Sequence, residues 1–194
     1  IELMSNFELV SSMPLLKKSE LSTSYLTPKV SLRFNPGDMK NYSSSTEKKI
    51  NIDNIFSNNR LGVTDSFEPG RSLTLGIDYK KENLSDINKY FEVKLATVLR
   101  DQEENHIPKI STINRKNSNL FGSIKNNFSQ NFELDYNFAI DNDFKTFEYN
   151  GLQTRFLANN FITEFNFVEE NGEMGDNNFF ENTTSFSVDK NNFL

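Results

Sequence analysis

The sequence predicts an all-β fold: an antiparallel transmembrane β-barrel sector, with about 8–10 meandering strands of a larger outer-membrane barrel. Two observations lead to this prediction. Apolar and polar residues alternate along many segments of about 10 residues, the length of a tilted strand that crosses a bilayer. The connections between these segments alternate between brief turns and mostly longer polar stretches, an asymmetry that outer-membrane barrels show.

The alternation is clearest in the central part of the chain. Every second residue is apolar in 132–140, and the same period of two returns in 161–168. Between them, 147–158 opens with Phe147 and Tyr149 in one phase. A period of two places successive side chains on opposite faces of a strand. Because only a few residues separate these segments, they are predicted to pair as consecutive antiparallel hairpins.

Alternating patterns elsewhere predict further strands, and two long polar connections separate some of them. The remaining predicted strands cover residues 1–10, 25–34, 70–79, 91–100, 120–128 and 180–188. The segment 15–23 is ambiguous. Residues 36–69 and 101–118 are predicted to be long outer loops, because connections of this length are usually functional or disordered. The best helical candidate, 84–90, is too short to matter for the fold.

Two alternatives to this architecture remain open at this point. A soluble β-sheet protein would have strands of about 5–6 residues and Greek-key crossovers more often than the pattern found here. Its function would be that of a β-rich binding module on the cell surface. A different outer-membrane barrel, a porin or a nutrient transporter, would share the strand pattern.

Composition excludes several functional classes. The chain has 194 residues, a formal net charge of −6 and no cysteine, which argues against nucleic-acid binding and against thiolate metal sites. The single histidine, His106, lies in a predicted loop without a nucleophile at any motif spacing, so we expect no enzyme activity, catalytic residue, cofactor or metal. The acidic start, Ile1-Glu2-Leu3, does not resemble a signal peptide, and we expect an internal part of a longer protein.

One loop concentrates charge and glycine just before a predicted strand. Two interpretations of the segment 58–71 are open. In the simpler one, Arg60 and Arg71 pair with Asp65 and Glu68 while glycines supply unusual backbone angles. In the functional one, the same ion pairs hold the loop over or inside a barrel lumen. The candidate residues are Arg60, Gly62, Asp65, Glu68 and Gly70.

Two sequence motifs stand in the segment 25–79. The strand 25–36 has the pattern L-x-P, followed by alternating residues and a second proline. Ile55-Phe56 precede a loop, from Asn59 to Gly70, that contains Arg60, Gly62 and Asp65. Both motifs resemble those of the barrel of the lipopolysaccharide-assembly family LptD, whose loop reads "lF…R-x-x-G-x-D", although here one extra residue precedes the aspartate. The resemblance covers nearly the whole chain and is strongest over 25–79. No cysteine pair stands at Asn159-Asn160, where well-known members carry one.

The resemblance implies a function in transport, without chemistry. Residues 1–194 would form a partial LptD-like barrel domain of the translocon that inserts lipopolysaccharide into the outer leaflet of a Gram-negative outer membrane. Implied partners are lipopolysaccharide, outer-membrane lipids, an LptE-like lipoprotein plug, and an LptA-like periplasmic bridge reached through a domain outside this chain. The residues that would face the lumen are Thr74, Asp78, Glu133, Asp135, Asn137, Glu164 and Asn166. Those that would face lipid are Leu73, Leu75, Ile77, Phe132, Leu134, Tyr136, Phe138, Phe165 and Phe167.

Overall fold

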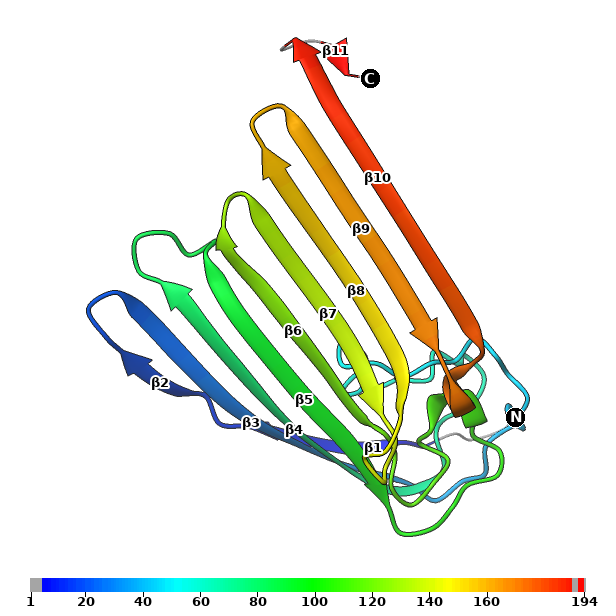
Figure 1. Cartoon of the computed structure of the whole chain (residues 1–194). Coiled ribbons are helices and arrows are strands. Elements are labelled where there is room, and N and C mark those ends of the chain that lie inside the picture. Colours follow the sequence, from blue (N-terminus) through cyan, green and yellow to red (C-terminus); the bar gives the residue numbers. More distant parts are fainter. Residues whose placement is uncertain (1–4, 190–191, 194) are drawn as a thin grey trace.

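A computed structural model of the chain describes residues 5–189 and 192–193. These residues form one antiparallel sheet in which the strands follow one another in chain order, except that β1 and β2 both pair with β3. Figure 1 shows the sheet as an open, curved wall. The strands are β1 (Phe7–Ser12), β2 (Leu15–Lys18), β3 (Ser22–Asn35), β4 (Gly70–Asn83), β5 (Tyr90–Arg100), β6 (Leu120–Ser129), β7 (Phe132–Ile140), β8 (Phe147–Ala158), β9 (Phe161–Glu170), β10 (Asn177–Asp189) and β11 (Asn192–Phe193).

The predicted strands are confirmed, with small differences at their ends. The ambiguous segment contains β2, which continues the line of β1 along the same edge of β3. The interruption falls at Met13-Pro14, where proline cannot donate a ladder hydrogen bond. Ile1 and Leu3 of the first predicted strand lie outside the described residues. Within those residues, no helix is long and apolar enough to cross a membrane.

The sheet has one largely polar face and one largely apolar face. Residues directly opposite each other in paired strands point to the same side, so the register defines the faces. On β3, Ser31, Arg33 and Asn35 are buried, whereas Leu32 and Phe34 between them are 50% and 40% exposed. We call the side of Ser31 and Arg33 the inner face and the side of Leu32 and Phe34 the outer face.

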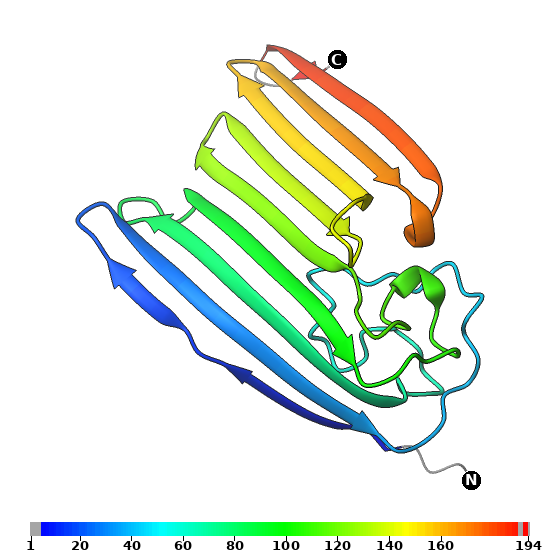
Figure 2. The same ribbon diagram turned by 60° about the horizontal axis from the view of Figure 1, so that its bottom comes forward.

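The long connections gather at one end of the sheet, and the short turns lie at the other (Figure 2). Residues 36–69 and 101–119 bury apolar side chains between themselves and the inner face of β5, β6 and β7. Two short 3₁₀ turns, η1 (Lys109–Ser111) and η2 (Gly172–Met174), belong to the same end. The buried core consists of Met39, Ile50, Ile52, Ile55, Leu61, Val63, Ala96, Val98, Ile107, Ile113, Phe121, Ala139 and Met174.

One part of the alternation is broken by a register shift in β8. Ala139 pairs with Tyr149, but the next residue, Ile140, pairs with Phe147, so Glu148 is an extra residue. Such a bulge moves the flanking side chains onto different faces. Phe147 and Tyr149, which the sequence pattern put in one phase, are therefore separated, and Tyr149 packs against the buried core.

Candidate functional site: the inner face and its anchored loop

The residues predicted to face a lumen all lie on the inner face. In β4, Thr74 is opposite Val98 and Asp78 is opposite Lys94. Lys94 is in turn opposite Ser123 of β6, which is opposite Asn137 of β7. Arg155 of β8 is opposite Glu133 of β7 on one side and Glu164 of β9 on the other. Asp135 and Asn166 are both opposite Gln153. Their common face is the one that residues 36–69 cover, since Arg60 of that loop donates a hydrogen bond to the Thr74 hydroxyl at 2.9 Å.

Charges of opposite sign cross the inner face from strand to strand. Lys125 lies 3.1 Å from Asp135, and Arg155 lies 3.2 Å from Glu164 and 3.7 Å from Glu133. These residues belong to the lining of a groove of about 450 Å³ over β6 to β10. The Arg155 side chain is 44% exposed, so this part of the inner face presents hydrated charges and amides. A surface of this kind suits sugars and other strongly hydrated groups.

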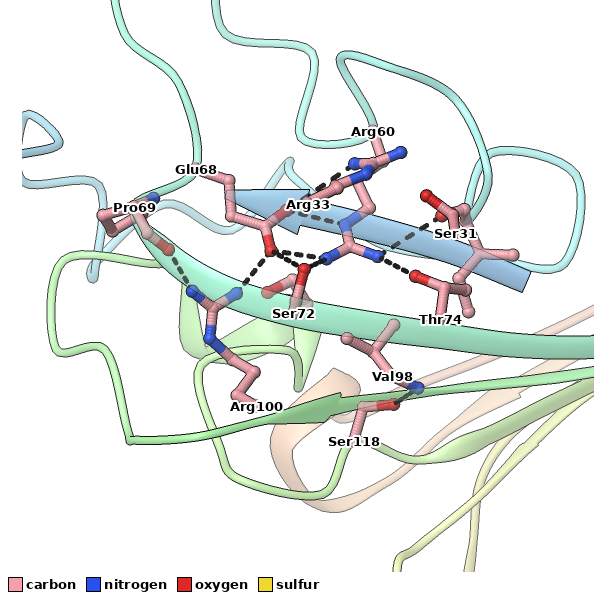
Figure 3. A network of polar contacts seen from close by, with 12 residues as sticks. Ser31, Arg33, Arg60, Glu68, Pro69, Ser72, Thr74, Val98, Arg100 and Ser118 are labelled. Carbon is pink, nitrogen blue, oxygen red and sulfur yellow. Dashed lines mark hydrogen bonds and ion pairs between the residues drawn. The ribbon is translucent and has the colours of Figure 1, made fainter. Parts of the chain in front are cut away.

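A buried ion cluster attaches the loop 36–69 to the inner face (Figure 3). Glu68 accepts hydrogen bonds from Arg60, at 2.7 Å for the Arg60 Nε, and from Arg100. Arg33 lies 3.8 Å from the same carboxylate and also bonds Glu8 at 2.7 Å. Arg33 of β3 and Arg100 of β5 thereby supply charged partners to the end of the loop, and Glu8 of β1 pairs with Arg33.

Arg60 connects the interior of the loop with β4 through hydrogen bonds. Its guanidinium donates hydrogen bonds to Ser72 at 3.1 Å, to Thr74 at 2.9 Å and to the Ile55 carbonyl at 3.4 Å. The Arg60 side chain is fully buried. Because a buried charge is costly unless it is paired and hydrogen-bonded, these partners allow the guanidinium to be buried in the molecule.

The environment of Glu68 keeps its carboxylate ionised. Burial alone would raise the pKa of Glu68, but Arg60, Arg100 and Arg33 outweigh that effect and lower it from 4.5 to about 2. The carboxylate is therefore charged at neutral pH. Its negative charge offsets part of the mutual repulsion of the three arginines, and Glu8 is a second acid beside Arg33.

The structure shows which ion pairs and backbone angles the loop motif adopts. Arg60 pairs with Glu68, and Gly62 and Gly70 have φ angles of 62° and 73°, the left-handed region that favours glycine. Asp65 instead pairs with Lys40 at 2.9 Å and accepts a hydrogen bond from Tyr42. The expected pairing of Arg71 with these acids is wrong, because Arg71 lies on the outer face against the Phe34 ring.

Other contacts, which no sequence motif indicated, also hold the loop against the sheet. The ring of Phe56 occupies the space above Gly76, where an added Cβ would come within 2.7 Å of it. Lys49 pairs with Glu170 of β9, which is 121 positions away in the chain. Sequence reasoning also missed Arg33 and Arg100 as members of the cluster. Their place in the polar phase of β3 and β5 was the available signal.

This arrangement offers a polar surface and a fixed loop. No group of three or more metal-ligating side chains comes together within the described ranges 5–189 and 192–193. His106 lies in the loop region, and its carbonyl accepts a hydrogen bond from the Tyr42 amide at 2.9 Å. The geometry suits passage or contact of hydrated groups along a wall.

Comparison with known proteins shows to which family this sheet belongs. A search of curated proteins found no significant match. Residues 2–188 match the family model LptD, described as LPS transport system D. That match covers nearly the whole chain and agrees with the open antiparallel sheet and its two faces. Because the match covers nearly the whole chain, the chain belongs to the LptD family and has a role in lipopolysaccharide transport at the outer membrane.

Proposed function

We propose that this chain forms part of the wall of the outer-membrane translocon that inserts lipopolysaccharide into the outer leaflet. The inner face lines the lumen and the outer face contacts membrane lipid. The observation that supports this most is the division of β3 and β4: buried polar residues Ser31, Ser72 and Thr74 alternate with exposed apolar ones. In a lipid bilayer an apolar outer face needs no further covering layer.

The outer face is too apolar to be left in water. Large side chains that are 36% or more exposed follow one another across the wall, and contiguous apolar patches of this kind mark contact with a membrane or a partner. Those on the outer face include Leu9, Leu32, Phe34, Leu75, Ile77, Phe132, Phe156, Phe165, Phe180 and Phe186. Lipid contact would remove all of this surface from water.

Polar residues on the outer face bond to one another. Asn182 donates to the hydroxyl of Thr163 at 3.0 Å and to the carbonyl of Glu164 at 3.1 Å. Thr163 and Thr184 share a hydrogen bond of 3.0 Å across β9 and β10. Polar groups within a membrane must find partners inside the protein. This cluster meets that requirement, which supports the same orientation of the wall.

The remaining expectations complete the proposal. Residues 1–194 form a barrel domain whose connections 36–69 and 101–118 lie on the outer side of the membrane. The lumen holds an LptE-like lipoprotein plug, and lipopolysaccharide reaches the barrel from an LptA-like periplasmic bridge. The chain supplies wall, lumen lining and loops, and performs no chemistry. The two-faced strands support this division of roles, because sugars need a polar path and acyl chains need an apolar one.

Cysteine accessibility tests the proposal directly. Single cysteines at positions 132 to 141 of the membrane-bound protein would be exposed to membrane-soluble and water-soluble thiol reagents. We expect even positions, such as Phe132 and Phe138, to react with the membrane-soluble reagent and odd positions, such as Glu133 and Asp135, with the water-soluble one. Ala139 should react with neither reagent, because it is buried beneath the loops. Uniform reaction with the water-soluble reagent would indicate a soluble surface module and would overturn the transport role of this wall.

A further inference from the structure

The outer face carries a groove at the end of the sheet where the long loops lie. It has a volume of about 680 Å³, within the range of sites that hold small ligands. Two rows of side chains cross its floor: Phe7, Phe34 and Arg71 are opposite one another in β1, β3 and β4, and Leu9, Leu32, Leu73 and Leu99 form the next row.

Arg71 differs from every other arginine of the chain. The sequence contains six arginines, and the other five take part in ion pairs. Within the described residues, no carboxylate lies within ion-pair distance of Arg71, although Asp101 belongs to the same groove. Instead, the Arg71 guanidinium carbon lies 5.6 Å from the centroid of the Phe34 ring. Such stacking orients the guanidinium while leaving its donors free for another partner.

The position of Arg71 in the sheet indicates which class of partner its guanidinium would bind. An arginine on the lipid face is costly at the middle of a membrane and costs little at its interface. Arg71 is the second residue of β4 and therefore lies at the end of the wall. In the proposed orientation, this end is at the level where lipid headgroups meet the apolar region. The leucine row lies one step further along the strands, where acyl chains would begin.

We propose that this groove binds a phosphorylated lipid of the outer leaflet, a lipopolysaccharide molecule that is already in the membrane. Its phosphate takes the free guanidinium of Arg71, and one acyl chain lies over Leu32, Leu73 and Leu99. Arginine matches phosphate through paired donors, which makes this recognition selective for the headgroup. The inference rests on the proposed outward orientation of the apolar face, but the site is separate from the polar inner face.

Photo-crosslinking in the membrane-bound protein tests this site. A photoreactive amino acid would replace Leu73, and the probes would be bis-phosphorylated lipid A and the dephosphorylated molecule with the same acyl chains. We expect crosslinking of the phosphorylated probe to need about tenfold more lipid in the variant Arg71→Gln, because a hydrogen bond between charged groups is lost. Arg71→Lys should retain part of the affinity.

Two controls make the outcome specific. Lys81→Gln removes an outward cation at the opposite end of β4 and should leave crosslinking at position 73 unchanged. Dephosphorylated lipid A should bind Arg71→Gln and the unaltered protein equally. Equal crosslinking of phosphorylated lipid A to both proteins would overturn the headgroup site while the wall itself stands. Crosslinking of neither lipid at position 73 would contradict the outward orientation as well.

Discussion

Two halves of the same inner face use charge in different ways. The covered half, on β3 to β5, lies beneath the loop 36–69 and holds Glu68 with Arg60 and Arg100, whose side chains are 10%, 0% and 0% exposed. The open half, on β7 to β10, carries Arg155 between two glutamates with all three side chains 44% to 54% exposed. The polar alternation is the same in both halves, but only the covered half removes its charges from water.

The same polar alternation can therefore anchor a loop in one place and stay hydrated in another. Buried ion clusters are sensitive to the loss of any member, because the remaining charges stay desolvated. Exposed pairs are screened by water and contribute little to stability. The covered half is therefore expected to fix the loop against the wall, and the open half to leave its charges in contact with solvent.

The largest effect is expected from Glu68→Gln. Removing this carboxylate leaves Arg60, Arg33 and Arg100 close together without their shared partner, which should destabilise the closed loop by about 3–5 kcal/mol. Hydrogen exchange of the amides in 36–69 would measure the change in the membrane-bound protein. Glu164→Gln, in the open half, is the matched control and should leave this exchange unchanged. Equal protection in both variants would show that the cluster does not hold the loop.

Acid should selectively lower the free energy that holds the loop against the covered half, by an amount on the order of 3 kcal/mol. The pKa of Glu68 is lowered from 4.5 to about 2 in the folded state, so its stabilising contribution is present above pH 4.5 and is lost as the pH falls towards 2. Limited proteolysis of 36–69 across this window would report the loop. The Glu68→Gln variant should lose this pH dependence, and its retention there would assign the effect to another group.

The smallest effect is expected from Arg155→Gln in the open half. The ion pairs of Arg155 with Glu133 and Glu164 are exposed, so their loss should lower the free energy of unfolding by about 1 kcal/mol or less. Thermal unfolding in detergent, followed by the electrophoretic shift of the folded barrel, would check this. A loss as large as that of Glu68→Gln would mean that the open half is covered in the membrane-bound protein.

Much of the fold could be predicted from the sequence because strand alternation is a local property. The alternation in Phe132–Ile140 predicts the two faces of this strand without reference to any other part of the chain. The predicted strands and the family are confirmed. The exception at Glu148 shows the limit, since a bulge shifts Tyr149 onto the inner face without a clear local signal. The lumen and lipid roles of the two faces remain predictions.

Local patterns predict where strands run, which side of each strand is polar, and that Gly62 and Gly70 belong to a charged loop. The folded chain is needed to see that this loop packs on the inner face, that Glu68 contacts Arg33, Arg60 and Arg100, and that Arg71 lies on the outer face. The two kinds of feature differ in the range of the interactions that produce them. Alternation depends on neighbours two positions apart, whereas Arg100 and Glu68 are 32 positions apart and meet only when the sheet has formed.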